Sequence, residues 1–454
     1  MGRLIVVSNR VGPLRDTGKA GGLAVALVDV LRDRGGVWFG WTGDITEDGT
    51  FSEMRRERSR NMELATIDVT QADNDEFYAG YANRTLWPIL HYRLDIAEFS
   101  PDFEAGYLRV NKRFATRLQP LVGEQDRIWV HDYHFLPLGA HLRELGIANR
   151  IGFFLHIPWP PTEILSALPR HRHLVRSMLA YDVIGFQTER DRRHFVDYLR
   201  EEAGGFEHGD GRWEAWGQVV RIEAFPIGID TEGFRAYAEG PEARREILRL
   251  EKHLRGRAQI VGVDRIDYSK GIPHRFRAFD RLLEDFPENL GRVSMLQISP
   301  PSRSEVFAYV EIRRELEHLA GHVNGRYADI DWTPIRFISR GFPRRALAGI
   351  YRKSRVGLVT SLRDGMNLVA KEYVAAQDPE DPGVLVLSRF TGAAETMTEA
   401  IIANPYAADE TAAAMQTALT MPLDERRQRH AALYANLVTH DARWWANAFL
   451  DRLD

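Results

Sequence analysis

The sequence predicts an α/β protein with two doubly wound domains that contain parallel sheets. Short apolar runs alternate with amphipathic segments along almost all of the 454 residues. Such alternation is typical of βα units, in which helices cover a parallel sheet. The chain is also long enough for two or three domains, each with a core of its own. We therefore expect two domains of about 200 residues.

The expected strands are runs of six to nine residues rich in Val, Ile, Leu and Phe. Six precede the middle of the chain, at 3–9, 37–42, 127–133, 150–157, 183–188 and 220–228. Five follow it, at 258–265, 293–300, 335–341, 355–361 and 383–389. Amphipathic helices are expected between them, for example at 21–33, 188–203 and 273–286. The order is that of repeated strand–helix units.

The boundary between the domains is expected within residues 225–242. Pro226, Gly228, Gly233 and Gly240 punctuate this stretch, and it has no clear periodicity. We predict a first domain at 1–230 and a second at 231–437. The last helix, at about 438–454, is expected to pack back on the first domain. Ligands would then bind in a cleft between the two domains.

Composition excludes several classes of function. A formal net charge of -4 and a pI near 6.5 give no general attraction to nucleic acid or to an anionic membrane, so phosphate recognition must be local. The absence of cysteine excludes disulfides, zinc thiolate sites, iron–sulfur clusters and thiol nucleophiles. No segment has the length of a signal peptide core or a membrane span. We expect a soluble cytoplasmic protein with neither nucleic acid nor membrane as a partner.

The first motif is SNR followed by AGGLAVAL, near the N-terminus. A strand ends at Ser8, Arg10 follows it, and a helix opens at Gly21 and Gly22. Paired glycines allow a ligand close to the backbone, and free N–H groups at a helix start attract phosphate. The alternative interpretation is a tight loop that needs a flexible backbone.

The second motif is VGVDRIDYSKG. A strand runs into a turn that carries Arg265 and Lys270. Two cations at the carboxyl end of a strand suit a diphosphate whose charge grows as a bond breaks. The alternative is a solvated turn with surface charges.

The third motif is DGMNLVAKEY, at a strand-to-helix junction. Gly365 allows a sharp turn, Asp364 can accept from sugar hydroxyls, and the N–H groups near Leu368 and Val369 can hold phosphate. Glu372 lies one turn further on and can bind the paired hydroxyls of a ribose. The alternative makes Asp364 a helix cap and Glu372 a surface residue.

Polar and aromatic residues of the first half follow no helical or strand stripe. They are Trp41, Tyr78, Trp87 and Asp132. Tryptophan is most often a core residue, and that is the interpretation favoured for them without further context. His131 and His134 could suggest a metal pair, but their spacing straddles a strand end, so we expect no metal there.

Taken together, these motifs resemble one family. SNR, AGGLAV, WFGW, LWPILHYR, WVHDYHFLPL, IGFFLHIPWP, DRIDYSKG and SLRDGMNLVAKEY occur in unbroken order from about residue 3 to residue 450. They resemble the trehalose-6-phosphate synthases, which are retaining glycosyltransferases of family 20 with the GT-B fold. The resemblance implies two Rossmann-like domains, the first binding the acceptor and the second the nucleotide sugar. It also implies that glucose passes from a nucleotide sugar, with UDP-glucose expected, to glucose 6-phosphate without a metal or cofactor.

The resemblance also assigns roles to single residues. The implied acceptor residues are Arg10, Trp41, Tyr78, Trp87, Asp132 and Arg303. The implied donor residues are Gly21, Gly22, Arg265, Lys270, Phe342, Asp364, Leu368, Val369, Ala370, Lys371 and Glu372. Arg265, Lys270, Asp364 and His156 would act at the reacting centre. The arginines of the acceptor site would hold the 6-phosphate, and Trp87 would help to select the α-anomer. Trp159 departs from the family's pattern, in which we expect phenylalanine beside the donor sugar.

Two other functions stay open at this point. A synthase of the same fold could use another acceptor, such as glycerol 3-phosphate, or could take ADP- or GDP-glucose. A non-catalytic regulatory subunit could bind sugar phosphate and report its level to a partner. The presence of Arg265, Lys270 and Asp364 favours an enzyme. The motifs offer no dedicated carboxylate nucleophile, since Asp364 and Glu372 are both assigned to the donor. The resemblance implies front-side transfer with retention. Assembly into a dimer or tetramer is left open.

Overall fold

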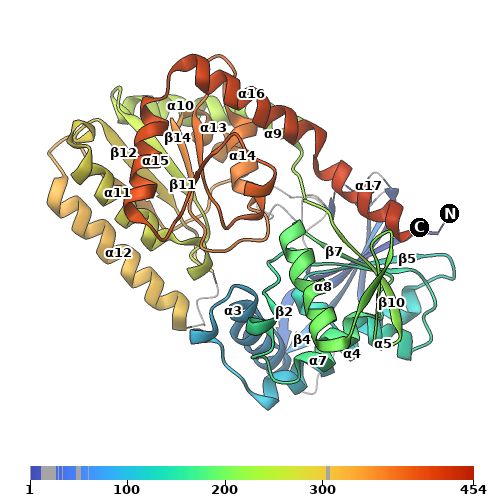
Figure 1. Cartoon of the computed structure of the whole chain (residues 1–454). Helices are drawn as coiled ribbons and strands as arrows, with labels where there is room; N and C mark the ends of the chain where they lie inside the picture. The colour runs from blue at the N-terminus through green and yellow to red at the C-terminus, as the bar shows by residue number, and fades with distance from the viewer. Residues whose placement is uncertain are drawn as a thin grey trace. The chain divides into compact units, whose positions relative to one another are not determined.

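The computed structural model describes residues 2–11, 27, 28, 30–32, 34–47, 53–59, 61–302 and 307–454. The chain divides into two compact units, and Figure 1 shows an α/β arrangement in each. Unit 1 comprises Met1–Ile227 and Arg443–Asp454, and unit 2 comprises Gly228–Ala442. The division falls inside the glycine- and proline-punctuated stretch 225–242. No helix in the described part of the chain is both long and apolar enough to cross a membrane.

Unit 1 contains a ten-stranded sheet with the order β3-β4-β2-β1-β5-β6-β7-β10-β9-β8. Its strands are β1 (Leu4–Arg10), β2 (Gly36–Thr46), β3 (Arg55–Ser59), β4 (Met62–Thr70), β5 (Arg127–His131), β6 (Ile151–Phe154), β7 (Val183–Phe186), β8 (Phe206–Gly209), β9 (Arg212–Ala215) and β10 (Gln218–Ala224). The pairs from β4 to β10 are parallel, whereas β3, β9 and β8 pair antiparallel at the two edges. Carboxyl ends of the parallel strands therefore meet at one edge.

The sequence did not predict β4, although all nine of its residues are buried. Glu63 and Asp68 interrupt its apolar run. Arginines of the edge strand β3 make their burial tolerable, because Arg58 Nε lies 3.3 Å from Glu63 and Arg55 Nη2 lies 2.8 Å from Asp68. A strand that depends on charges from its neighbour has no local apolar signature.

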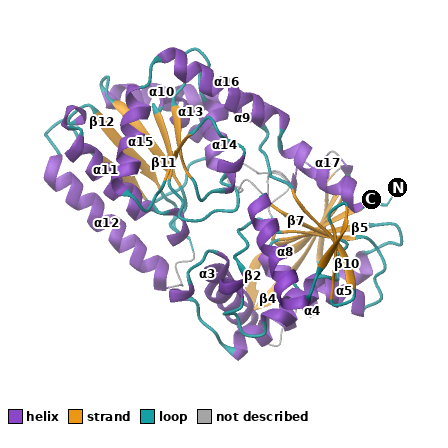
Figure 2. Ribbon diagram, in the orientation of Figure 1, coloured by secondary structure: helices purple, strands orange, loops and turns teal. Residues whose placement is uncertain are grey.

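Helices cover this sheet on both faces (Figure 2). The main ones are α4 (Pro101–Leu118), α5 (Leu138–Glu144), α7 (His171–Met178) and α8 (Glu189–Ala203), with shorter segments α2 (Gln71–Asp73), α3 (Trp87–Leu90) and α6 (Thr162–Leu165). One segment, Asn74–Leu86, is a π-helix of 13 residues, which carries Tyr78. Long π-helices are rare and tend to occur at functional sites.

Unit 2 contains a six-stranded parallel sheet with the order β13-β12-β11-β14-β15-β16. Its strands are β11 (Ala258–Val263), β12 (Val293–Ile298), β13 (Ile335–Ile338), β14 (Val356–Val359), β15 (Val384–Ser388) and β16 (Ile401–Ala403). Its helices are α9 (Thr231–Glu239), α10 (Pro241–Leu254), α11 (Ile272–Asp285), α12 (Phe307–Tyr327), α13 (Arg344–Lys353), α14 (Leu368–Ala376), α15 (Ala408–Thr420) and α16 (Leu423–Thr439). The strand order reverses beside β11, and such switch points open a crevice for ligands.

The last helix, α17 (Ala442–Leu453), packs against unit 1. The Trp445 side chain is fully buried, with its ring 4.9 Å from Trp129 and 5.1 Å from Phe154. Phe449 stacks on Trp129 at 4.8 Å. Helix α17 therefore contributes buried aromatic side chains to the core of unit 1.

Replacing Trp445 by alanine should lower the free energy of unfolding of unit 1 by about 3–5 kcal/mol, because a large buried ring is lost and a cavity is left. Chemical denaturation followed by tryptophan fluorescence measures this change. The exposed Asp451, on the same helix, provides the control, and Asp451→Ala should change the stability by less than about 0.5 kcal/mol. Equal effects of the two changes would contradict the role of Trp445.

Candidate functional site

In unit 2, the charged residues predicted from sequence lie at the carboxyl ends of β11 and β14. Lys270 Nζ contacts Asp364 Oδ2 at 2.5 Å, and both side chains are 14% exposed. Arg265, directly after β11, is 41% exposed, with its Nε 3.4 Å from the buried Asp267. Two cations and the carboxylate of Asp364 therefore lie at one edge of the sheet, an arrangement that could hold a diphosphate.

A fully buried arginine connects the strand ends at this edge of the sheet. Arg275, on α11, donates to Gln297 Oε1 at 2.7 Å, Asp264 Oδ2 at 2.8 Å and Thr360 Oγ1 at 3.0 Å. These partners lie at or just beyond the ends of β12, β11 and β14. Gly262 leaves room for the network, since a Cβ there would lie 2.2 Å from Arg275 Nη1. Sequence reasoning missed Arg275, because nothing in its helix distinguishes it from a surface residue.

Asn367 caps α14 by accepting from the Ala370 N–H at 3.0 Å, so the alternative in which Asp364 caps the helix is wrong. Asn367 also has φ 85°, a backbone conformation that residues other than glycine rarely adopt. Its amide nitrogen donates to Asp364 at 3.0 Å, so the residue both turns the chain and orients that carboxylate. The N–H groups of Leu368 and Val369 open the helix.

Glu372 is not a surface residue. It is 7% exposed, and Arg344 at the start of α13 donates to its Oε1 at 3.0 Å. Burial raises the pKa of Glu372, and Arg344 opposes this shift. The neighbouring Ala370 and Lys371 are also buried, and burial lowers the pKa of Lys371 to about 7. The carboxylate of Glu372 therefore has the cationic partner expected of an ionised ligand group.

Phe342 follows β13 and is partly buried. The Arg340 guanidinium lies 5.0 Å from the centre of its ring. A cation over an aromatic face holds that ring in place. Phe342 can therefore form an apolar wall at the same sheet edge as Arg265.

In unit 1, Arg10 lies at the end of β1 beside two predicted aromatic residues. Its Cζ is 3.9 Å from the centre of the Trp41 ring and 5.5 Å from that of Tyr78. Gly43 (φ 102°) admits the guanidinium, since a Cβ there would lie 2.0 Å from Arg10 Nη1. Trp41 is fully buried, so its part in this cluster is to support the cation.

Trp87 lies at the start of α3, and Asp132 directly follows β5. The Trp87 ring lies 4.1 Å from His91 and 5.5 Å from Tyr133. Asp132 has φ 77°, a conformation that costs free energy in a residue other than glycine, and its Oδ1 accepts from the backbone N–H of His156 at 3.2 Å. Such strain is common where a side chain must be aimed at a ligand.

His156 belongs to a chain of polar groups. Its Nε2 is 3.0 Å from His131 Nδ1, and its Nδ1 is 3.3 Å from Gln187 Nε2. Burial lowers the pKa of His156 to about 3, and burial together with His156 lowers the pKa of His131 well below its usual range. Both rings are therefore neutral. His131 pairs with His156, not with His134, which instead stacks on Tyr78 at 6.0 Å.

Four residues singled out from the sequence are not part of the groups described above. Gly21, Gly22 and Arg303 lie outside the described residues. Trp159 is fully buried between Phe186 and Phe195, at ring distances of 6.1 and 5.0 Å, so it belongs to the core of unit 1. Within the described residues, no group of three or more His, Asp or Glu side chains could hold a metal ion.

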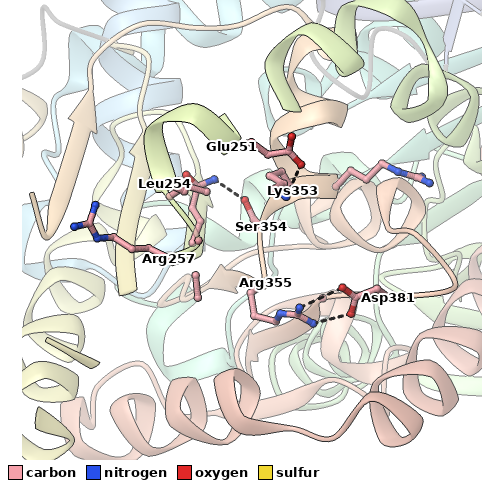
Figure 3. Close-up of a pocket in the computed structure, with 12 residues that line it drawn as sticks. Glu251, Leu254, Arg257, Lys353, Ser354, Arg355 and Asp381 are labelled. Atoms are coloured by element: carbon pink, nitrogen blue, oxygen red, sulfur yellow. Dashed lines mark hydrogen bonds and ion pairs between the residues drawn. The ribbon is translucent and has the colours of Figure 1, made fainter. Parts of the chain in front are cut away.

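A pocket of about 450 Å³ lies at the opposite edge of the unit 2 sheet (Figure 3). It is lined where β11, β14 and β15 begin, and its charges are paired, for example Lys353 with Glu251 at 2.8 Å and Arg355 with Asp381 at 3.1 Å. Ligand sites of parallel sheets lie at the carboxyl ends of the strands. This pocket is therefore separate from the candidate site.

The two parallel-sheet units, with polar groups at the carboxyl ends of their strands, have the GT-B fold of glycosyltransferases. The structure of an α,α-trehalose-phosphate synthase (UDP-forming) from Burkholderia xenovorans, in complex with glucose-6-phosphate, matches with a TM-score of 0.96 at 46% identity, covering 100% of both chains. A structure from E. coli bound with UDP-2-fluoro glucose also gives 0.96 at 46% identity, covering 100% of this chain and 99% of that one.

The sequence agrees at the level of the family. The model of glycosyltransferase family 20 matches residues 9–454. The trehalose-6-phosphate synthase of Sinorhizobium fredii (strain NBRC 101917 / NGR234) is 48% identical over 457 residues, covering 100% of this chain and 98% of the relative. That of Enterobacter sp. (strain 638) is 46% identical over 452 residues, covering 99% and 94%. The chain belongs to glycosyltransferase family 20.

The buried histidines predict a pH dependence of stability. Because the folded pKa of His156, about 3, lies below the unfolded value near 6.5, the unfolded state binds more protons in this window. The resulting stabilisation is complete above about pH 6.5 and is lost as the pH falls, by at most about 1.4 kcal/mol per pH unit for each histidine. Urea denaturation of the wild type and of His131→Asn at several pH values measures it. The variant should show the smaller slope, and equal slopes would contradict the assignment.

Proposed function

We propose that this chain transfers glucose from UDP-glucose to glucose 6-phosphate with retention, giving α,α-trehalose 6-phosphate and UDP. The observation that carries the proposal is the group formed by Arg265, Lys270 and Asp364 at the carboxyl edge of the unit 2 sheet. The family, and relatives similar over their whole length that are called trehalose-6-phosphate synthases, support the same reaction.

Unit 2 binds the donor in this proposal. Arg265 and Lys270 hold the diphosphate, and the N–H groups of Leu368 and Val369 add donors at a helix start. Asp364, oriented by Asn367, accepts from the hydroxyls of glucose. Glu372, held by Arg344, binds the ribose. The similar E. coli structure with UDP-2-fluoro glucose supports a donor of this kind.

Unit 1 binds the acceptor. Arg10, held over Trp41, takes the 6-phosphate together with Arg303, which lies outside the described residues. Tyr78, Trp87 and Asp132 bind the sugar ring. The similar Burkholderia xenovorans structure in complex with glucose-6-phosphate supports this acceptor.

Retention follows from front-side transfer. The diphosphate leaves, an oxocarbenium-like centre forms, and the acceptor hydroxyl attacks from the same face while its proton passes to the departing oxygen. Asp364 is already bonded to Lys270 and Asn367, and Glu372 to Arg344, so neither carboxylate is placed as a nucleophile. Fixed cations that stabilise the leaving charge therefore supply most of the rate.

A panel of UDP-, ADP- and GDP-glucose against glucose 6-phosphate and glycerol 3-phosphate tests the proposal. We expect the highest kcat/KM for UDP-glucose with glucose 6-phosphate, with an α,α-linked phosphorylated disaccharide identified by NMR. Preference for glycerol 3-phosphate would overturn the acceptor, and preference for another nucleotide would overturn the donor. Binding of sugar phosphate without transfer from any donor would indicate a regulatory subunit.

Lys270→Ala should lower kcat by about 100- to 1000-fold, because a fixed charge that stabilises the departing diphosphate is lost. The KM for glucose 6-phosphate should change much less, since the acceptor contacts other residues. The matched control is Lys353→Ala, which removes a lysine at the opposite edge of the same sheet, where it pairs with Glu251. Steady-state kinetics measure both, and near-normal turnover of Lys270→Ala would refute its role.

A further inference from the structure

Three neighbouring parallel strands of unit 1 each end in a polar residue that belongs to one hydrogen-bonded chain. His131 is the last residue of β5, His156 follows β6, and Gln187 directly follows β7. His131 and Gln187 are 0% and 2% exposed. Within such a chain a hydrogen bond forms only where a donor faces an acceptor, and at its far end His131 Nε2 has no hydrogen-bond partner among the described residues.

A backbone amide sets the direction of the chain. The Ile227 N–H donates to Gln187 Oε1 at 3.0 Å, and an N–H group can only donate. The side-chain oxygen of Gln187 therefore faces Ile227, and its NH₂ group faces His156 Nδ1 at 3.3 Å. Since an NH₂ group also only donates, His156 Nδ1 must be the bare, accepting nitrogen.

The tautomers of both histidines follow from this direction. A neutral imidazole carries one proton, so that of His156 is on Nε2 and is donated to His131 Nδ1 at 3.0 Å. The proton of His131 is then also on Nε2. Both ring nitrogens of His156 are thus occupied by protein groups.

Protonation of His156 would break the chain. Its Nδ1–H would then point at the NH₂ group of Gln187, placing donor against donor. The rings of Phe154 and Trp445, at 4.7 and 5.9 Å, offer no counter-charge. Among the described residues, the Asp132 carboxylate contacts His156, and it accepts from the backbone N–H at 3.2 Å.

We propose that Gln187 and His131 are positioning residues for the transfer reaction, which hold the His156 ring neutral and in its Nε2–H tautomer. The inference rests on the proposed function and on the role at the reacting centre that the family resemblance implies for His156. A positive ring there would repel the oxocarbenium-like centre, whereas a neutral ring does not. With both nitrogens occupied, the ring also cannot compete for the proton of the acceptor hydroxyl.

Gln187→Glu tests the proposal with almost no change of shape. One carboxylate oxygen still accepts from Ile227, but the other faces His156 Nδ1 and forces a proton onto it. NMR of the full chain with ¹⁵N-labelled histidine should show a bare Nδ1 on both rings in the wild type and a protonated Nδ1 on His156 in the variant. At neutral pH, kcat should fall by about 10- to 100-fold, with both KM values within about twofold.

His131 provides the matched pair of variants. The oxygen of asparagine can replace Nδ1 as an acceptor, whereas leucine cannot, so His131→Asn should retain at least about tenfold more turnover than His131→Leu. A merely structural role would lower stability without moving the tautomer or separating kcat from KM. These variants also keep the test decisive if Gln187→Glu fails to fold.

Two results would overturn the inference. One is a wild-type His156 that carries its proton on Nδ1. The other is a Gln187→Glu variant with the switched tautomer and unchanged kcat. Failure of the proposed function is distinguishable, because a wild type that forms no transfer product would still show its tautomers by NMR.

Discussion

The charge of Arg275 is the constraint on which the donor side of the molecule depends. A guanidinium with no exposed surface must find its partners inside the protein, because an unpaired buried charge costs several kcal/mol. Its three partners, Asp264, Gln297 and Thr360, lie at the ends of three different strands of the unit 2 sheet. Satisfying this one charge therefore fixes the strand ends from which the turns that carry Arg265 and Asp364 leave.

In unit 1, the side chains that join the strand ends are uncharged. The ends of β5, β6 and β7 are joined through Gln187 and two neutral histidines rather than through an ion pair. In the proposed reaction the two solutions are complementary. Cations lie where negative charge develops on the leaving diphosphate, and positive charge is withheld where the sugar ring becomes cationic. The same electrostatic requirement therefore accounts for a charged network in one unit and a neutral one in the other.

The sequence predicted the α/β class, the family and the strands that are rich in apolar residues, because these features are local patterns. It did not predict β4, whose buried Glu63 and Asp68 depend on arginines of another strand. It did not predict that Asn367 takes a positive φ and caps α14. Arg275, Arg344 and Gln187 were also missed. Each is defined by partners far along the chain, and no local pattern records them.

The direction of the histidine chain shows why side-chain identities alone were insufficient. Glutamine and histidine each offer a donor and an acceptor, so Gln187, His156 and His131 by themselves permit two opposite arrangements of protons. The Ile227 N–H removes this degeneracy, because a peptide nitrogen cannot become an acceptor. One backbone N–H thus determines which atoms of the three side chains donate and which accept. It belongs to Ile227, the last residue of unit 1 before the polypeptide enters unit 2. The direction of these hydrogen bonds therefore depends on the backbone N–H of residue 227 and not on its side chain. Only proline, which has no N–H to donate, would remove this constraint.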